Sequence, residues 1–319
     1  MEALHQRTEL LLGTPTMEAL KSTRVILFGV GGVGGWCAES LIRSGIGHLT
    51  IVDSDTVNPT NLNRQLVATT QTVGRAKVEV LRERLLSINP EAEIVAHHAL
   101  YTPENADSYA LASYHYVVDA IDSLENKAHL LLVATGTPAT VVSSMGAALK
   151  MDPTRISVAE FWKVRGCPLA AALRRRFKRD GAHPRRKIKC VYSEELLANA
   201  GTPSGDESPE VHGGSVKART NGTVAHAVAI FGFTLAGLVV QDVEKGIILA
   251  RRITPHAASA AGLQASHKVR IPKGEPPVGM RTLFFAGIAS AFFFIFKHGE
   301  VSHKPQKLLQ RASKLYLMP

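Results

Sequence analysis

Near the N-terminus lies the stretch Arg24-Val25-Ile26-Leu27-Phe28-Gly29-Val30-Gly31-Gly32-Val33-Gly34-Gly35, a short apolar run followed by a turn dense in glycine. Gly29, Gly31 and Gly34 have the spacing of a nucleotide-binding turn. The missing side chains let backbone N–H groups approach a polyphosphate, and the N-terminus of the following helix favours its negative charge. The stretch therefore predicts a strand, a phosphate-binding loop and a helix over residues 36–44.

A second apolar run, residues 49–52, leads directly to Asp53. An acidic residue about 20 positions past the last motif glycine can accept hydrogen bonds from ribose hydroxyls. Nicotinamide-dependent oxidoreductases have the same glycines and the same acid, so these residues indicate a nucleotide without indicating a reaction. A tight strand-to-helix turn that binds nothing is the structural alternative.

Apolar periodicity continues the alternation of strands and helices along the chain. It predicts helices over residues 74–89, 104–112 and 123–133, strands over 93–96 and 140–144, and a buried strand that starts at Tyr116 and ends in two carboxylates, Asp119 and Asp122. Such alternation without internal repeats predicts an α/β fold, a Rossmann-like, doubly wound, mostly parallel sheet with helices on both faces. We expect a helical arm at 1–23, this domain at 24–250 with a basic helical and loop part toward its C-terminal end, and a tail at 251–319.

The chain has 319 residues and a formal net charge of +10. Much of this excess lies between residues 163 and 189, where Lys and Arg are opposed only by Asp180. The excess favours a polyanionic partner or an anionic membrane surface, with a solvated basic surface as the alternative.

The three cysteines, Cys37, Cys167 and Cys190, form no Cys-x-x-Cys pair. Their spacing excludes a four-thiolate zinc site within one chain and favours a reducing compartment. The first 23 residues mix charges with leucines and do not resemble a secretory signal.

Three segments in the second half of the chain differ in composition. Residues 199–221 are rich in Gly, Ser, Pro and Thr and predict a mobile loop. Residues 222–249 predict a long apolar helix, buried or packed in a dimer in preference to a membrane span. In the tail, residues 283–296 are almost wholly apolar and rich in phenylalanine, but shorter than the roughly 20 residues that a bilayer requires. This segment could insert shallowly into a membrane, span one with neighbours, or pack on the domain.

Polar groups should gather at the carboxyl edge of the sheet beside the glycine turn, and they are Asp53, Asn61, Asn63, Arg64, Gln65, Lys77 and Asp122. Hydride transfer has little need of an Arg and a Lys that converge on phosphates opposite a carboxylate. Cleavage of ATP between its α- and β-phosphates does need them, because Arg64 and Lys77 can stabilise the developing charge and Asp122 can hold Mg²⁺. Singly, these residues could also be surface cations, a helix cap and turn residues.

Several motifs combine around this edge: Gly-x-Gly-Gly-x-Gly at 29–34, Asp53-Ser54-Asp55, Asn61-Leu62-Asn63-Arg64-Gln65, Lys77 and Asp119-Ala120-Ile121-Asp122-Ser123. Together they resemble the signature of the ubiquitin-activating, MoeB and ThiF superfamily of adenylating enzymes. Residues 151–156, 167–177 and 189–193 resemble one branch of it, the tRNA threonylcarbamoyladenosine dehydratases. The resemblance extends from about Leu11 to about Lys245.

The resemblance implies ATP and Mg²⁺ as cofactors, Arg64, Lys77 and Asp122 as catalytic residues, and Asp122 as the metal ligand. The ATP-binding residues that it implies are Gly29, Gly31, Gly32, Gly34, Asp53, Asp55, Asn61, Asn63, Arg64, Gln65, Lys77, Ala120, Ile121, Asp122 and Ser123. The free carboxylate of threonylcarbamoyladenosine, next to the anticodon of tRNA, would be adenylated, and a nitrogen of its own urea would then close a ring with loss of AMP.

The implied partners are tRNA carrying threonylcarbamoyladenosine and a second copy of the chain. The residues expected to contact tRNA are Arg174, Arg175, Arg176, Lys178, Arg179, Arg185, Arg186 and Lys187. Relatives usually carry an Arg three residues before the glycine found here at Gly13, and this Arg reaches the partner subunit's nucleotide; this chain has Leu10 there, with Arg7 nearby. A cytoplasmic location is expected. By analogy with fungal relatives, residues 283–296 could instead anchor the chain at the mitochondrial outer membrane.

Two alternatives remain besides the oxidoreductase. The chain could adenylate the C-terminus of a ubiquitin-like or sulfur-carrier protein, although the missing Cys-x-x-Cys pairs and the basic stretch disfavour this. It could also be a tRNA-binding module that keeps the nucleotide fold without catalysis.

Overall fold

The computed structural model describes residues 4–201, 211–212, 215–216 and 221–246. The predicted tail at 251–319, its Phe-rich segment 283–296 and most of the predicted mobile loop lie outside the described residues. Within that loop, β8 (Val211–His212) and β9 (Ser215–Val216) pair as a short antiparallel ladder.

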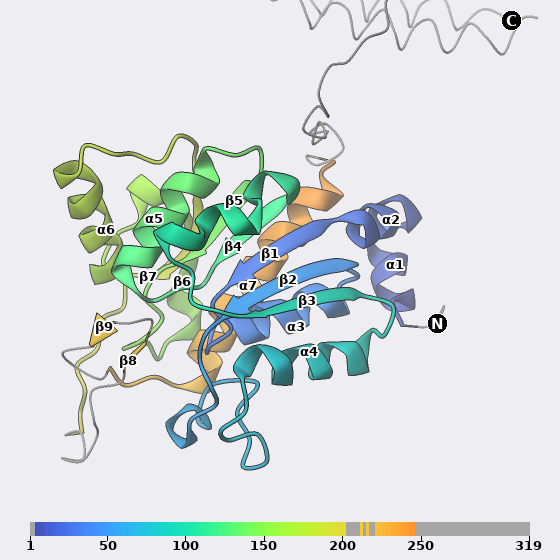
Figure 1. Ribbon diagram of the computed structural model, residues 1–319, viewed down its shortest axis with the longest axis horizontal. Coiled ribbons are helices and arrows are strands. Elements are labelled where there is room, and N and C mark those ends of the chain that lie inside the picture. Colours follow the sequence, from blue (N-terminus) through green and yellow to red (C-terminus); the bar gives the residue numbers. More distant parts are fainter. Residues whose placement is uncertain (1–3, 202–210, 213–214, 217–220, 247–319) are drawn as a thin grey trace, which may run out of the picture. The chain divides into compact units, whose positions relative to one another are not determined.

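A seven-stranded sheet forms the centre of the fold (Figure 1). Its strands are β1 (Arg24–Phe28), β2 (His48–Asp53), β3 (Glu93–His98), β4 (Tyr116–Asp119), β5 (Thr140–Ser144), β6 (Ile156–Glu160) and β7 (Lys189–Ser193). Their order is β3-β2-β1-β4-β5-β7-β6, and only the edge strand β6 runs antiparallel to its neighbour. The order reverses between β1 and β4, which in such sheets opens a crevice at the carboxyl ends of the strands.

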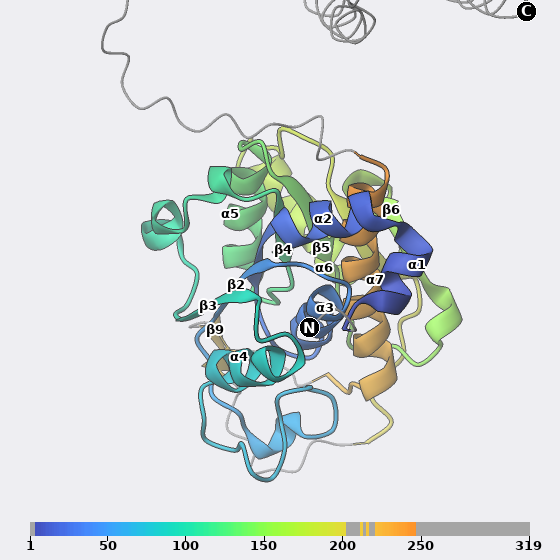
Figure 2. The same cartoon turned by 90° about the vertical axis from the view of Figure 1, so that its right-hand side faces the viewer.

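Helices cover both faces of the sheet (Figures 1 and 2). The helices are α1 (Gln6–Leu12), α2 (Thr14–Ser22), α3 (Gly34–Arg43), α4 (Lys77–Ile88), α5 (Leu124–Thr135), α6 (Pro168–Arg179) and α7 (Ala225–Glu244). One apolar core joins the sheet to α3, α4 and α7, and the other joins it to α5 and α6. The predicted fold class is therefore confirmed.

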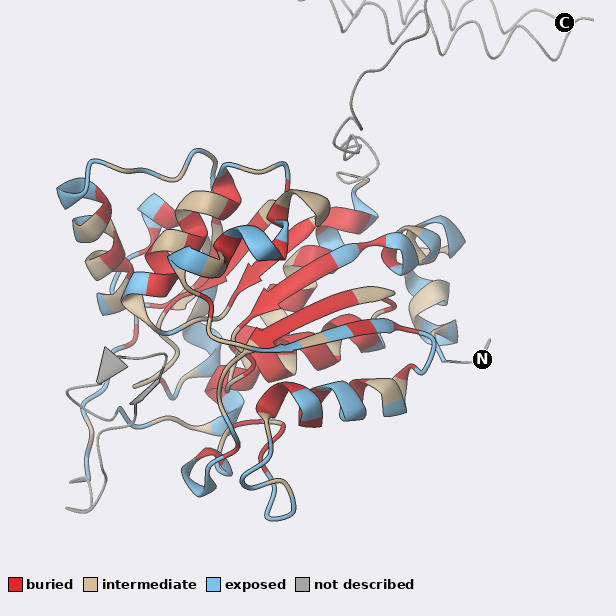
Figure 3. Ribbon diagram, viewed as in Figure 1, coloured by how far each residue is buried: buried red, intermediate tan, exposed pale blue. Residues whose placement is uncertain are grey.

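The central strand β1 shows why two cores form. Val25 and Leu27 belong to the core under α3 and α7, whereas Ile26 and Phe28 belong to the core under α5. Successive strand side chains point to opposite faces, so a strand with four consecutive apolar residues must be covered on both. Figure 3 shows the resulting buried centre, with exposed residues on the outer turns of the helices.

One predicted α-helix is wrong, because the segment forms 3₁₀ helices. Residues 104–112 form two 3₁₀ helices, Pro103–Tyr109 and Leu111–Ser113. Ala110 lies between them with φ 44°, a left-handed conformation that an α-helix cannot contain. The buried side chains of Tyr109 and Leu111 on either side hold this break in the core.

Helix α7 is long and apolar enough to cross a membrane, with a mean hydropathy of 1.6, and 56% of its apolar window is buried in the fold. It packs closely on α3 at Gly232, where an added Cβ would lie 2.5 Å from the carbonyl oxygen of Val33. Its Asp242 forms a 2.6 Å ion pair with Lys189 of β7. These contacts make α7 a core helix.

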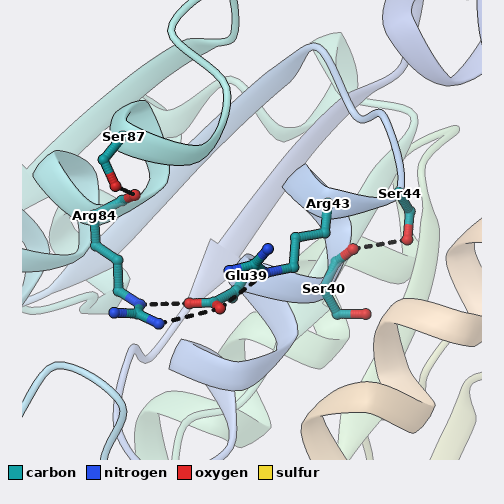
Figure 4. Close-up of polar contacts among 6 residues, drawn as sticks. All are labelled: Glu39, Ser40, Arg43, Ser44, Arg84 and Ser87. Carbon is teal, nitrogen blue, oxygen red and sulfur yellow. Dashed lines mark hydrogen bonds and ion pairs between the residues drawn. The ribbon is translucent and has the colours of Figure 1, made fainter. Parts of the chain in front are cut away.

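Glu39 joins α3, the helix that follows the glycine turn, to α4 (Figure 4). It is 6% exposed, and its carboxylate accepts hydrogen bonds from Arg84 of α4 and from Arg43 one turn along α3. Burial alone would raise the pKa of Glu39, but hydrogen bonds and charge from Arg84 and Arg43 outweigh it and lower that pKa.

We expect Glu39→Gln to lower the free energy of unfolding at pH 7 by about 1–2 kcal/mol, because charged hydrogen bonds between the helices are lost. A carboxyl with a lowered folded pKa stabilises the fold above its unfolded value of about 4.3 and loses that effect as pH falls through the folded pKa. The difference between variant and wild type should therefore vanish in acid. Urea unfolding at a series of pH values measures it.

Glu83→Gln is the matched control, since Glu83 and its partner Arg75 are both exposed and such pairs contribute little. An equal loss in both variants, or a Glu39→Gln difference that persists unchanged in acid, would contradict the assignment.

Candidate active site

A cavity of about 580 Å³ opens at the carboxyl ends of β1, β2, β4 and β5, where the strand order reverses. A volume of this size suits a drug-sized or nucleotide-sized ligand. The predicted site residues that line it are Gly29, Gly31, Gly32, Asp53, Asp55, Asn63, Arg64, Gln65, Lys77, Ala120, Ile121, Asp122 and Ser123. Gly34 and Asn61 lie behind this lining. The structure thus brings the predicted residues to one place, from five separate segments of the chain.

The glycine turn can adopt its shape only without side chains. Gly29 has φ 86°, and a Cβ there would lie 2.7 Å from the carbonyl oxygen of Ala120. Gly34, the first residue of α3, packs equally closely on the backbone of Gly29. The turn therefore presents bare backbone to the cavity at the N-terminus of α3, which favours an anion.

Asp53, which the sequence predicts to bind ribose hydroxyls, ends β2 and lines the cavity. Its carboxylate accepts hydrogen bonds from the backbone N–H of Val30, at 2.7 Å, and of Asp55, at 2.8 Å. Burial raises the pKa of Asp53 above its ordinary value, and the charge of Lys77 offsets this only in part. The carboxylate ties the glycine turn to β2 and still lines the cavity.

Lys77 is the first residue of α4 and is only 2% exposed. Its Nζ forms a 2.9 Å ion pair with Asp55, and its backbone N–H donates to the carbonyl of the same residue. A buried ammonium beside one carboxylate keeps donors for a second anion. The lysine is thus held in place at the cavity wall by Asp55, in the segment that follows β2.

Arg64 also lines the cavity and belongs to the long loop between β2 and α4. Its Nη1 donates to the carbonyl of Thr60 and to Oδ1 of Asn63. Trp36 donates to the carbonyl of Arg64 at 3.3 Å. Asn63 in turn donates to the carbonyl of Thr223, so this loop is joined to the segment that precedes α7.

Two buried amides in the same loop have polar atoms without partners among the described residues. They are Nδ2 of Asn61 and Oε1 of Gln65. Leaving such atoms unpaired costs roughly 1–3 kcal/mol each. Gln65 lines the cavity, so a ligand bound there would be stabilised by pairing with its Oε1, whereas Asn61 lies behind the lining. Together with the bare glycine turn, Gln65 fits a nucleotide site.

The two carboxylates of the Asp119–Ser123 motif have different surroundings. Asp119 is fully buried, 2.7 Å from the equally buried Lys127, and accepts from Ser143 and from the N–H of Ile121. Lys127 also donates to the carbonyl of Ile121. Asp122 is exposed at the cavity edge. Only Asp122 is therefore placed to touch a ligand, while Asp119 and Lys127 hold the loop that carries it.

The sequence did not point to several residues of the cavity. Ala99, Leu100 and Tyr101, which follow β3, line it, as does Asn126 in the first turn of α5. The hydroxyl of Tyr101 lies 3.0 Å from Nδ1 of His129. Neither the short loop after β3 nor a single Asn in a helix has a recognisable spacing, so no sequence signal marks them.

Some cations of the basic stretch bind backbone carbonyls or carboxylates, and five of the predicted set are exposed. Arg174 donates to the carbonyls of Phe161 and Val164, and Arg186 donates to carbonyls at the end of α5 and before β5. Arg176 pairs with Glu125 and Asp180, and Arg179 pairs with Asp180. The exposed cations of the predicted set are Arg175, Lys178, Arg179, Arg185 and Lys187.

All three cysteines are buried. Burial raises the pKa of Cys37 and Cys190, so both thiols stay neutral at physiological pH. Across the described residues, no three His, Cys, Asp or Glu side chains converge as a metal site. A cation at Asp122 would need most of its ligands from a bound phosphate or from water.

Comparisons with known proteins agree with this geometry. The ThiF family profile matches residues 5–306. The tRNA threonylcarbamoyladenosine dehydratase of Bacillus subtilis is 35% identical over 254 residues, which cover 78% of this chain and 98% of that protein. The Escherichia coli protein of the same name is 39% identical over 195 residues, or 60% and 73% of the two chains.

A crystal structure of the Escherichia coli dehydratase, TcdA, in complex with ATP superimposes with a TM-score of 0.68 at 34% identity, covering 79% of this chain and 98% of that one. Both the family match and the extent of the relatives exceed what a shared fold alone would give. The chain belongs to the ThiF family.

Proposed function

We propose that this protein is an ATP-dependent tRNA threonylcarbamoyladenosine dehydratase. The observation that carries the proposal is the gathering of the glycine turn, Asp53, Arg64, Lys77 and Asp122 around one cavity, in a chain that spans 98% of a curated dehydratase. The arrangement suits charge stabilisation on a polyphosphate, which adenylation requires.

The chain's own residues would divide the work as follows. The turn at Gly29–Gly34 would hold phosphates through backbone N–H groups, and Asp53 would accept from ribose hydroxyls. Lys77 and Arg64 would stabilise charge that develops on the phosphates as the α–β bond breaks. Lys77 is suited to this because Asp55 holds its ammonium in place before any ligand arrives.

The reaction needs two displacements. The threonyl carboxylate attacks the α-phosphorus, and diphosphate leaves. A nitrogen of the urea then attacks the activated acyl carbon, AMP leaves, and the ring closes with the net loss of one water. Both buried cysteines with raised pKa values are poor nucleophiles, so we propose no thioester step.

Magnesium would bind at Asp122. The side chain is an exposed carboxylate at the cavity edge, and Mg²⁺ commonly takes one or two carboxylates together with phosphate oxygens and water. The ion would neutralise phosphate charge, while Lys127 and Asp119 keep the backbone of the loop in position.

Transfer RNA would contact the exposed cations of α6 and the following segment, which are Arg175, Lys178, Arg179, Arg185 and Lys187. Arg174 and Arg186 are left out of this surface because their guanidinium groups bind backbone carbonyls. We also propose a cytoplasmic setting, in line with the bacterial dehydratases that the chain resembles.

A homodimer is the proposed assembly. Leu10 and Leu11 on α1 are each 82% exposed, an unusual degree for adjacent leucines on a helix. Arg7 is exposed on the same helix and would be the cation nearest a partner's site. Membrane contact through residues 283–296 rests on their sequence alone.

The first test is mass spectrometry of nucleosides from threonylcarbamoylated tRNA incubated with the full-length protein, Mg²⁺ and ATP. We expect the modified adenosine to lose one water, only when ATP is present, with one AMP released per event. An unchanged nucleoside together with AMP formation stimulated by a small carrier protein would favour the alternative adenylating function.

Lys77→Ala should slow AMP release about 10²–10³-fold, as for the loss of a buried group that stabilises transition-state charge. Single-turnover rates with saturating ATP and tRNA measure this, with thermal unfolding as the check on folding. Lys21→Ala, an exposed lysine at the end of α2, is the control. A Lys77→Ala protein with at least a third of the wild-type rate would remove Lys77 from the catalytic set.

Neutralising Arg175, Lys178 and Lys187 together should weaken tRNA binding and make its salt dependence less steep. Each lost phosphate contact should lower the slope of log K against log salt by about one. Filter binding between low and moderate salt measures both quantities.

The matched control removes three exposed cations elsewhere, Lys21, Arg75 and Lys245. Equal changes in the two triple variants would mean that only net charge matters, and unchanged binding in the first would leave α6 as a solvated basic surface.

A further inference from the structure

Asn126 has features that its place in the fold does not explain. It lies in the first turn of α5, is 7% exposed and lines the cavity. None of the described residues forms a hydrogen bond with its side chain. It does not complete a cap, since α5 begins without a side-chain cap hydrogen bond. No hydrogen bond within the described fold therefore accounts for this amide, and its place in the cavity lining leaves it available to a ligand.

The surroundings of Asn126 indicate which part of a nucleotide it would meet. The glycine turn follows β1, Asp53 ends β2, and the segment Ala99–Tyr101 follows β3. Since β1, β2 and β3 are neighbours in the sheet, these three sites lie in a row along its carboxyl edge. Phosphates at the first site and ribose at the second place the base at the third.

Asn126 lies beside this third site. Three residues further along α5, His129 meets the hydroxyl of Tyr101 at 3.0 Å, and residues three apart share one face of a helix. The ring of Tyr101 also packs edge-on against Phe28, another residue of the cavity wall. The base would therefore lie between the aromatic residues of this wall and the amide of Asn126.

We propose that Asn126 recognises the adenine base. Its carbonyl oxygen accepts a hydrogen bond from the 6-amino group, and its NH₂ donates to the adjacent ring nitrogen, N7 or N1. An amide matches this donor–acceptor pair on adenine, and it cannot match in the same orientation a purine with a 6-oxo group. The inference rests on the proposed function, because it requires ATP in the cavity.

The test is isothermal titration of the full-length protein, with Mg²⁺, against ATP, purine riboside triphosphate, 7-deaza-ATP and 1-deaza-ATP. The purine analogue lacks the 6-amino group, and each deaza analogue lacks one ring nitrogen. Wild-type protein should bind the purine analogue and one deaza analogue about tenfold or more weakly than ATP, as a lost bidentate contact implies.

Two variants assign these losses to Asn126. Asn126→Ala should bind ATP about tenfold more weakly and should no longer distinguish the four nucleotides. Asn126→Asp keeps an acceptor for the amino group but has no donor. It should still reject the purine analogue and should lose its preference against the deaza analogue. An acidic residue in the first turn of a helix is favourable, so this variant should fold even if the alanine variant is weakened.

Glu125→Ala is the control from the neighbouring position, since Glu125 is exposed and does not line the cavity. It should bind all four nucleotides like the wild type. The inference is overturned if Asn126→Ala discriminates among the nucleotides as the wild type does, or if the wild type does not discriminate. If the wild type binds none of them, the proposed function fails and this inference fails with it.

Discussion

The ion pair between Asp119 and Lys127 has no contact with solvent, and the cavity depends on it. It joins the end of β4 to α5, and the two side chains also bind the N–H and the carbonyl of Ile121. Burying both charges has a large desolvation cost, which a buried pair offsets only when its remaining hydrogen bonds are made. Here Ser143 donates a further hydrogen bond to the carboxylate of Asp119. The buried pair therefore fixes the backbone of the loop from Ala120 to Asp122.

This fixed loop sets the shape of the glycine turn. The backbone of Ala120 is so close to Gly29 that no side chain fits there, and Gly34 packs on Gly29 in turn. The turn is thereby held between β1 and the loop after β4, and Gly29, Gly31 and Gly32 line the cavity. Sequence reasoning explained these glycines by their approach to phosphate. The structure adds a second reason, the approach of one piece of backbone to another.

Local patterns predicted the sheet, most helices and the residues that gather at the cavity, because each depends on spacing within one segment. Local patterns gave wrong or incomplete predictions where a contact with a residue elsewhere in the chain determines the structure. The two carboxylates of the Asp119–Ser123 motif look alike in sequence, yet Asp119 is buried in an ion pair with Lys127 and Asp122 is exposed. Residues 104–112 have helical periodicity, but Ala110 adopts a left-handed conformation between two buried side chains. Asn126 has no sequence signal, since only the fold places it at the cavity.

The roles of the cations in the basic stretch also depend on contacts that the sequence does not reveal. Eight cations looked equivalent in sequence, but Arg174 donates to the carbonyls of Phe161 and Val164, and Arg186 donates to the carbonyl of Thr135 at the end of α5. A guanidinium suits this role because its donors spread in a plane and reach several carbonyls at once. Removing either would alter the packing of α6 or the approach to β7 as well as the charge. The surface that can attract a polyanion is therefore smaller than the net charge suggests, and it is concentrated on the outer face of α6 and the segment before β7.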